Sequence, residues 1–237
     1  MRRCGGYYEC PTDAKGNRLG PLVGYASSYE NHSGVRQHFV GEKYVDFAMV
    51  EQWPSIVSKH IATPLCEKML STVGQKKKLV LCGAPEGAKC LAALMAECLG
   101  IRYVYPKKVE SKPSIEGQRA QTTFLFDRHH INPGDEVVIV EDVCHNFSTT
   151  MELIRIITAA GGTVNLICCF LNRSERHQEW FTPYGGGKYR VVALWNEPMP
   201  SWTQASAIVA DDIANGNVVW KPKQSWRQLH KVMKKAA

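Results

Sequence analysis

Apolar runs of strand length alternate with helical segments in the middle of this chain, and this alternation most restricts how it can fold. Two segments rich in Ala, Leu or Ile end at glycines, as helices commonly do: EGAKCLAALMAECLG (86–100) and MELIRIITAAGG (151–162). Strands that alternate with helices pair in parallel through helical crossovers. The sequence therefore predicts an α/β fold, a mostly parallel sheet with helices on both faces. The expected strands are KLVLCG (78–83), IRYVY (101–105), TTFLF (122–126), EVVIVED (136–142), TVNLICCFLN (163–172) and YRVVALW (189–195).

Weaker patterns flank this core. Residues 1–35 show little periodicity and predict irregular structure, whereas residues 38–50 alternate in places as a half-buried strand pair would. Trp53-Pro54 then starts a helix, which Pro64 should bend or interrupt. We expect three parts, an N-terminal arm with part of a small hood (1–52), the α/β core (53–195), and a C-terminal segment that completes the hood and carries a basic helix (196–237).

Two polar connections in the core are longer than an ordinary α/β turn, residues 106–121 and residues 172–188, and both are expected to be loops. The tail WKPKQSWRQLHKVMKKAA (220–237) predicts a basic surface helix. Its apolar side chains, Trp226, Leu229 and Val232 or Met233, should pack inward.

Composition limits the classes of function. The net charge of +7 over 237 residues suits anionic ligands such as phosphorylated metabolites, and does not by itself indicate nucleic acid, which we regard as an unlikely partner. A contact of the basic tail with nucleic acid or a membrane stays open as an alternative. No apolar run approaches the roughly 18 residues of a membrane span, and no apolar stretch follows the basic N-terminus, so a cytoplasmic protein without a membrane association is expected. Six of the nine cysteines lie in apolar surroundings and should be buried, reduced thiols: Cys82, Cys90, Cys98, Cys144, Cys168 and Cys169.

The stretch VVIVEDVCHNFSTTMELIRII (137–157) carries the clearest chemical signal. Its apolar strand ends in Glu141 and Asp142, and hydroxyl side chains then open a helix. Ligands of open parallel sheets bind at the carboxyl ends of the strands, and a helix N-terminus attracts anions. Carboxylates there can accept hydrogen bonds from sugar hydroxyls or hold hydrated Mg²⁺. A sugar-phosphate site and an ordinary capped helix explain this stretch equally well when it is taken alone.

The same stretch resembles the phosphoribosyl-pyrophosphate motif of the type I phosphoribosyltransferases, in its orotate phosphoribosyltransferase branch. The resemblance assigns Glu141 and Asp142 to the ribose hydroxyls and Thr149 to the 5′-phosphate loop, with Thr150 beside it. The Thr-Thr-Gly-Gly core of that loop is replaced here by His145, Asn146, Phe147 and Ser148. A phenylalanine in a left-handed conformation costs on the order of 1–2 kcal/mol. The alternative is a loop of another shape in which the side chains of His145 and Asn146 donate hydrogen bonds.

Other segments extend this resemblance over roughly residues 33 to 195. The turn after residues 78–83 resembles the family's pyrophosphate-binding turn, and residues 106–117 resemble its mobile basic loop, whose lysines stabilise the departing pyrophosphate. Arg173 resembles the arginine that contacts the orotate carboxylate, with Asn172 in place of an aspartate, and Lys43, or else Arg36, resembles a basic residue near the substrate. The residues so assigned to the turn and the loop are Ala84, Pro85, Glu86, Gly87, Lys107, Lys108 and Lys112.

The resemblance implies transfer of a phosphoribosyl group from phosphoribosyl pyrophosphate to an aromatic, orotate-like base. Glu141, Asp142, Lys107 and Lys112 would be the catalytic residues, and the others would bind substrate. It also implies Mg²⁺ bound with the pyrophosphate, no direct protein metal site, and a homodimer. A non-catalytic regulator of the same fold that binds a nucleotide or sugar phosphate is the second hypothesis, and the altered loop favours it.

Overall fold

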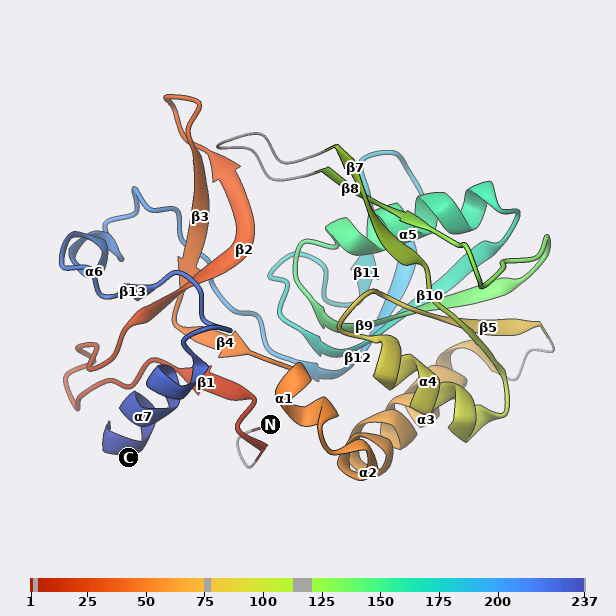
Figure 1. The fold of residues 1–237 in the computed structure, drawn as a ribbon, viewed down its shortest axis with the longest axis horizontal. Coiled ribbons are helices and arrows are strands. Elements are labelled where there is room, and N and C mark those ends of the chain that lie inside the picture. The colour runs from red at the N-terminus through yellow and green to blue at the C-terminus, as the bar shows by residue number, and fades with distance from the viewer. Residues whose placement is uncertain (2–3, 75–77, 113–120, 237) are drawn as a thin grey trace. The chain divides into compact units, whose positions relative to one another are not determined.

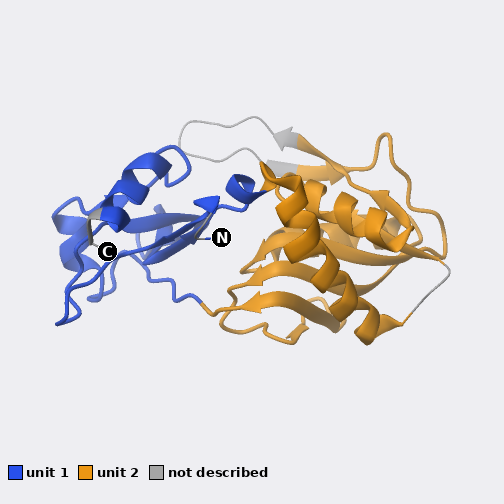
Figure 2. Cartoon of the chain, turned by 90° about the horizontal axis from the view of Figure 1, so that it is seen from below, with its two compact units in different colours: residues 1–50, 199–237 blue, residues 51–198 orange. Residues whose placement is uncertain are grey.

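The computed structural model describes residues 1, 4–74, 78–112 and 121–236 (Figure 1). The chain divides into two compact units (Figure 2). Unit 1 consists of residues 1–50 and 199–237, and unit 2 consists of residues 51–198. None of the helices in the described part of the chain combines the length and apolar character that crossing a bilayer requires.

Unit 2 contains a six-stranded sheet in the order β11-β12-β10-β9-β5-β6. All neighbouring strands pair in parallel except β11 (Trp180–Phe181), which is antiparallel to β12 (Tyr189–Asn196). The predicted α/β class with a mostly parallel sheet is thus confirmed. The other strands are β5 (Leu79–Gly83), β6 (Arg102–Val104), β9 (Glu136–Cys144) and β10 (Thr163–Asn172).

Helices cover both faces of this sheet, as predicted (Figure 1). On one face, α3 (Thr63–Val73) and α4 (Lys89–Leu99) pack against each other and against the strands. On the other face lies α5 (Ser148–Ala159), which contacts β9, β10 and β8. The central strands are buried almost throughout, because both of their faces are covered.

The helical segment that begins at Pro54 is not a regular α-helix throughout. It runs through α2 (Pro54–Val57), a π-helical turn (Ser58–Ala62) and α3. The Thr63 N–H donates to the Ser58 carbonyl, five residues earlier, just before Pro64 enters the first turn of α3. The expected interruption at Pro64 is therefore a widened turn, which accommodates a residue without an N–H.

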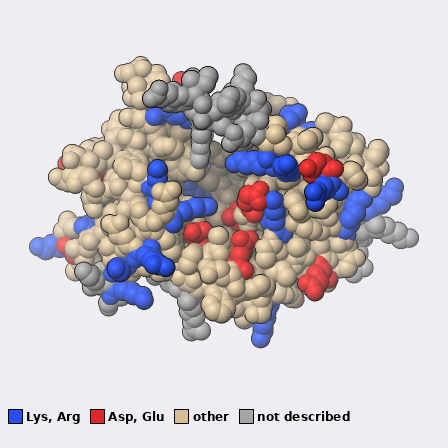
Figure 3. Space-filling model, viewed as in Figure 1, with Lys and Arg blue, Asp and Glu red and all other residues tan. Residues whose placement is uncertain are grey.

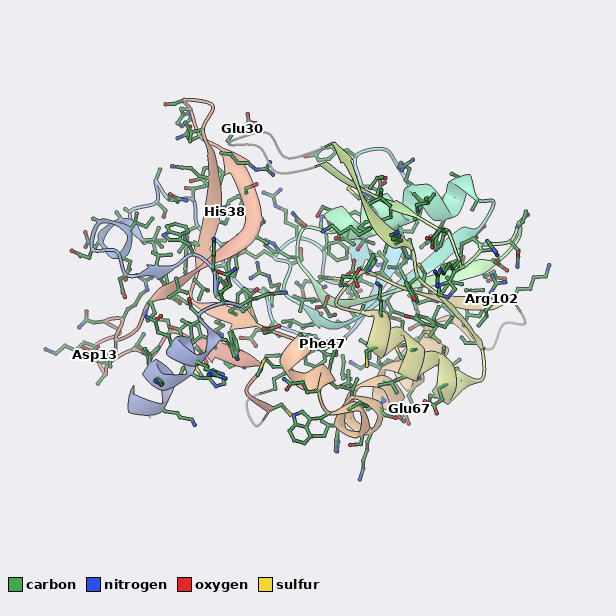
Figure 4. All side chains as sticks on the ribbon, in the orientation of Figure 1. Asp13, Glu30, His38, Phe47, Glu67 and Arg102 are labelled. Carbon is green, nitrogen blue, oxygen red and sulfur yellow. The ribbon has the colours of Figure 1, made fainter. Side chains whose placement is uncertain are left out.

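Two predicted loops of unit 2 contain strands. Residues 106–121 include β7 (Lys107–Lys112), which pairs with β8 (Gln121–Leu125) in an antiparallel hairpin, and residues 172–188 include β11. The loop prediction was wrong at β7, where polar side chains hid the strand pattern, and at β11, which is only two residues long. On edge strand β6, Arg102 (labelled in Figure 4) forms an ion pair with Asp135 in the turn before β9.

Unit 1 contains two small sheets. β1 (Tyr7–Glu9) pairs antiparallel with β4 (Lys43–Val45), and β13 (Val218–Val219), β2 (Leu22–Glu30) and β3 (Arg36–Gly41) form the other sheet. The predicted strand pair within 38–50 is present, but irregular structure throughout 1–35 was wrong. The strand β2 escaped notice because its pairing with β3 shifts register between Gly24 and Ser28, which breaks the two-residue period. The remaining elements are α1 (Ala48–Glu51), at the boundary of the units, and α6 (Ala210–Ala214) and α7 (Trp226–Ala236).

The basic C-terminal helix is present as α7. Trp226 and Leu229 are buried in a cluster with Tyr8, Val23 and Tyr25, and Met233 packs against the same cluster. All nine cysteines are free thiols. Of the six that were predicted to be buried, Cys90 is only partly buried and Cys98 is exposed, because the buried positions of α4 are Leu91, Ala92, Met95 and Ala96.

Candidate functional site

The turn after β5 lies against the end of β9. The Ala84 N–H donates to the Val140 carbonyl at 2.9 Å, and the Ala88 N–H closes the turn on the Ala84 carbonyl at 3.0 Å. The peptide bond between Pro85 and Glu86 is cis. A side chain at Gly87 would overlap the carboxylate of Asp142, so in this conformation only a glycine lets the carboxylate lie on the turn. The predicted pyrophosphate turn and the predicted ribose-binding carboxylate are therefore in direct contact.

The acidic pair at the end of β9 is split between two environments. Glu141 is buried and accepts a hydrogen bond from the Thr150 hydroxyl at 3.1 Å. Burial, together with the charge of Asp142, raises the pKa of Glu141 to about 8, so this carboxyl is largely protonated at neutral pH. Asp142 is only partly buried. The two carboxyls can therefore act differently, Glu141 as a hydrogen-bond donor and Asp142 as an acceptor.

Helix α5 begins directly beyond this pair. The Ser148 N–H and hydroxyl both donate to Asn146 Oδ1, at 3.3 and 3.0 Å. Thr149 is partly buried and Thr150 is fully buried, with its hydroxyl turned back to Glu141. Asn146 thus closes the turn before the helix as a side-chain acceptor, while the N-terminal amides of α5 supply the positive end of its dipole.

Phe147 adopts a left-handed conformation, with φ 57° and ψ 20°. Its side chain is buried between strands and loop, where it stacks on Phe181 and meets His177 edge-on. The first of the two alternatives for this loop therefore holds. Only the backbone of Phe147 is left to contact a ligand, because its ring belongs to the core cluster of Cys144, Ile167, Cys169, Phe181, Val191 and Ala193.

Arg173 reaches this edge of the sheet from β10. The backbone N–H of Arg173 donates to the Cys144 carbonyl at 2.9 Å, and the residue is almost fully buried. Burial and the positive charge of Arg173 lower the pKa of His145 to about 4, which makes His145 a neutral imidazole at physiological pH. A guanidinium close to His145 of the α5 loop has the charge and shape to bind a carboxylate or phosphate.

Asn172 has a structural role in the turn that follows. Its Nδ2 donates to the carbonyls of His177 and Gln178, at 2.7 and 3.1 Å, while its Oδ1 accepts from the Ser174 N–H. An aspartate could not donate the two bonds to carbonyls. These local hydrogen bonds explain why asparagine, and not the aspartate of the resembled family, stands at residue 172.

The predicted basic residues are distributed over both units. Lys107 and Lys108 are exposed at the start of β7, and Lys112 ends the same strand, its side chain outside the described residues. Lys43 belongs to unit 1, where its ammonium pairs with Glu9 at 3.3 Å. The structure brings Lys107 and Lys108 into the same unit as the acidic pair and leaves Lys43 in the other unit.

Sequence reasoning missed Lys89. Its Nζ lies 2.6 Å from Glu86 Oε2 and 4.6 Å from the centroid of the Tyr105 ring. It thereby neutralises the carboxylate in the turn where an anion was expected. The only sequence signal was a lysine three residues after a glutamate, a common helical pair.

Among the residues that the structure describes, no three His, Cys, Asp or Glu side chains gather as a metal site. Mg²⁺ usually keeps several waters and binds through one or two carboxylates with substrate phosphates. Asp142, partly exposed, fits such a role better than the buried Glu141.

Known proteins resemble this chain at low identity, and no protein-family model matches it. The orotate phosphoribosyltransferase of Heliobacterium modesticaldum is 24% identical over 169 residues, which cover 70% of this chain and 80% of that protein. That of Halobacterium salinarum is 26% identical over 168 residues, 71% of this chain and 85% of that protein.

Solved structures of similar proteins include the orotate phosphoribosyltransferase of Aeropyrum pernix, 18% identical with a TM-score of 0.42 over 73% of this chain and 87% of that one. The adenine phosphoribosyltransferase of Leishmania tarentolae is 18% identical with a TM-score of 0.49, and the match covers 75% of this chain and 83% of that one. The relatives found by sequence thus make this chain a distant homologue of orotate phosphoribosyltransferases, at 24% and 26% identity over 70% and 71% of its length.

Proposed function

We propose that this protein transfers a phosphoribosyl group from phosphoribosyl pyrophosphate to an aromatic base that carries a carboxylate, as orotate does. One observation carries the proposal: β5, β9 and β10 are adjacent and parallel, and their carboxyl ends bring together the turn at Gly87, the Glu141–Asp142 pair and Arg173. This is the edge where ligands of parallel sheets bind. The curated relatives that span most of the chain are orotate phosphoribosyltransferases.

Each group has a role that follows from its chemistry. Asp142 accepts hydrogen bonds from the ribose hydroxyls as positive charge develops on the sugar, and protonated Glu141 donates one. The amides of residues 145–150, with the hydroxyls of Ser148 and Thr149 and the polar side chains of His145 and Asn146, hold the 5′-phosphate. Thr150 instead orients Glu141.

The leaving group and the base use the remaining residues. The backbone of Ala84, Pro85, Glu86 and Gly87 contacts pyrophosphate, and Lys107, Lys108 and Lys112 neutralise its charge. Arg173 orients the carboxylate of the base, and Lys43 is proposed to lie near the substrate. Mg²⁺ bound to pyrophosphate oxygens would supply further charge neutralisation, with Asp142 as its protein contact.

Asp142→Asn tests the enzymatic proposal. Pyrophosphate release is measured with phosphoribosyl pyrophosphate, Mg²⁺ and a panel of bases led by orotate. Loss of the carboxylate charge should reduce turnover at least about 10-fold, as the removal of an electrostatic group usually does. Asp211→Asn changes an exposed carboxylate in α6 and should leave turnover unchanged. Wild-type turnover in the Asp142 variant would place the site elsewhere.

A second candidate function is a regulator that binds a sugar phosphate without turnover. Phe147 favours the regulator, because the loop has a buried phenylalanine at a position where the family has glycine. Calorimetric titration with phosphoribosyl pyrophosphate separates the two functions when it is combined with the release assay. Binding without release on any base supports the regulator, and release with orotate supports the enzyme.

The biological setting completes the proposal. We propose a cytoplasmic homodimer, as the family resemblance implies, in which residues 1–52 and 196–237 form the small hood of the family. Sedimentation at several protein concentrations tests the dimer.

A further inference from the structure

The C-terminal segment carries almost all of the net positive charge of the chain. Residues 220–237 contain six Lys or Arg residues and no Asp or Glu, while the net charge of the whole chain is +7. The α7 surface consists of the five exposed cations that the structure describes there, all in unit 1: Lys221, Lys223, Arg227, Lys231 and Lys234. The sequence left open whether this tail contacts nucleic acid or a membrane. We propose that the α7 surface binds the phosphate backbone of a nucleic-acid duplex.

Helix α7 presents three of these cations on one face. Because successive residues of an α-helix are about 100° apart, Arg227, Lys231 and Lys234 lie within an arc of about 60°. The buried residues Trp226 and Leu229 lie on another side of the helix and anchor it in the core of unit 1. Figure 3 shows Lys and Arg side chains gathered on the part of the surface around α7. The packing of α7 therefore holds a row of cations in place and leaves them in solvent.

Interactions within the protein do not account for this row of cations. In the part of the chain that the structure describes, no residue of the α7 surface forms an ion pair with a carboxylate, whereas Arg18 of the same unit pairs with two at 2.8 Å. Arg227 lies in the first turn of α7, where the helix dipole disfavours a positive charge. Arg227 and Lys231 are four residues apart on the helix, so their like charges repel each other. The row thus lowers the stability of the free protein, and an anionic partner would relieve this repulsion.

The spacing of the cations fits a strand of a duplex. Arg227 and Lys234 are about 10 Å apart along the helix axis, and one strand of a duplex carries about three phosphates over that length. Lys221 and Lys223 directly precede α7 in the chain and add charge at its N-terminal end. Cations that contact successive phosphates release the condensed counterions of the duplex, which drives binding. Phosphate contacts do not read bases, so we expect binding that is independent of sequence.

A membrane surface and a single strand fit the α7 surface less well than a duplex. A helix that lies on a membrane inserts its apolar side chains among the lipids, but those of α7 are packed in unit 1: Trp226, Leu229 and Met233. A single strand is held by aromatic side chains on which its bases stack, and the indole of α7 is buried. A duplex bound through its phosphates needs neither an exposed apolar face nor a stacking surface.

Fluorescence anisotropy of a labelled DNA duplex of mixed sequence, titrated with the full-length protein, tests the proposal. The logarithm of the binding constant should fall linearly with the logarithm of the salt concentration between about 50 and 200 mM, with a slope of about −3 or steeper. Three phosphate contacts alone account for a slope of about −2.7. No binding at about 50 mM salt with protein up to about 100 µM would overturn the proposal.

Variants of α7 locate the binding surface. The triple variant Arg227→Ala/Lys231→Ala/Lys234→Ala should weaken duplex binding at least about 10-fold at about 50 mM salt. The salt slope should become shallower by about 0.9 for each phosphate contact that is lost. The variant Arg227→Lys/Lys231→Arg/Lys234→Arg keeps every charge and should bind as the wild type does. These side chains are exposed, so both variants should fold.

A matched control removes three exposed cations elsewhere in the chain, Lys15→Ala/Lys59→Ala/Arg128→Ala. It changes the net charge by the same amount and should keep most of the affinity and the salt slope. Equal weakening in the control and in the α7 alanine variant would mean that net charge alone attracts the duplex, which would contradict a defined surface.

Two further probes distinguish the kinds of partner. Binding to vesicles that contain phosphatidylserine, without binding to the duplex, would replace the proposal with a membrane contact. Tighter binding of a single strand than of the duplex would also contradict it. The measurement needs no turnover and uses no residue of the catalytic edge. Release of pyrophosphate without duplex binding would therefore refute the α7 surface alone, and duplex binding without release would refute the transferase proposal alone.

Discussion

The phenyl rings of Phe147 and Phe181 stack with their centroids 4.6 Å apart and their planes 11° from parallel. Phe147 makes this contact from a left-handed backbone conformation, φ 57°, at the N-cap position just before α5. The cost of that conformation, roughly 1–2 kcal/mol, is offset by the burial of the ring. A loop that binds phosphate through glycines elsewhere is here anchored to the core through a side chain.

Substitutions of Phe147 separate the two contributions to stability, which are the cost of the left-handed backbone and the gain from burying the ring. Phe147→Ala should lower the free energy of unfolding by about 3–5 kcal/mol, because it removes a buried aromatic ring. Phe147→Gly should be less destabilised than Phe147→Ala by about 1 kcal/mol, because glycine adopts the left-handed conformation without strain. Urea denaturation of both variants measures the difference. A glycine variant less stable than the alanine variant would contradict the left-handed conformation.

Gly87→Ala tests the contact between the turn after β5 and Asp142. The added methyl group would overlap the carboxylate, so the Asp142 side chain must move. We expect Gly87→Ala to lower turnover at least about 10-fold because it displaces this charged group, while stability changes little because the end of a side chain moves at low cost. Gly185→Ala is the matched control, since its methyl group would meet open space, and should leave turnover and stability unchanged. Wild-type turnover in Gly87→Ala would show that the contact with Gly87 does not position Asp142 for the reaction.

The pH dependence of stability should report Glu141. Its pKa is raised from 4.5 to about 8, so the native state binds one more proton than the unfolded state between these values, and stability falls as pH rises. His145 has its pKa lowered from 6.5 to about 4, which gives stability the opposite slope between pH 4 and 6.5. The two slopes oppose each other below pH 6.5, and the fall due to Glu141 remains between pH 6.5 and 8.

Glu141→Gln should remove this fall. The wild-type slope between pH 6.5 and 8 is at most about 1.4 kcal/mol per pH unit, the value for one proton. Denaturant unfolding at half-unit intervals of pH measures it. Glu136→Gln, at the other end of β9, serves as a control that keeps the slope. An unchanged slope in Glu141→Gln would assign the titration to another group.

Arg173→Met should raise the pKa of His145. The positive charge of Arg173 is one of the two causes of the lowered value, and burial is the larger. The pKa should therefore move up from about 4 and stay below 6.5. Histidine ring signals in a two-dimensional NMR titration measure it, and Arg155→Met, which removes an exposed pair with Glu152, should have no effect. An unchanged pKa of His145 would show that the charge of Arg173 does not act on the α5 loop.

The strands and helices of unit 2 that carry a strong apolar pattern were predicted from sequence alone, because that pattern is a local property of each segment. β5, β9 and β10 are continuous apolar runs, and α4 ends at Gly100 in a left-handed cap, as its glycine indicated. Strands β2 and β7 were not recognised, because a register shift and polar side chains removed that local signal. Strand β8 was predicted, but it pairs with β7 outside the six-stranded sheet, which no local pattern indicates.

Tertiary structure alone decided how the chemical groups differ from one another. Glu141 and Asp142 are neighbours of equal chemistry in sequence, and only packing buries one and leaves the other partly exposed. The same holds for Phe147, whose ring lies in a core formed by strands β9, β10 and β12 and by Phe181 of β11. Burial and charge proximity depend on residues that are distant along the chain, so no local pattern could contain them.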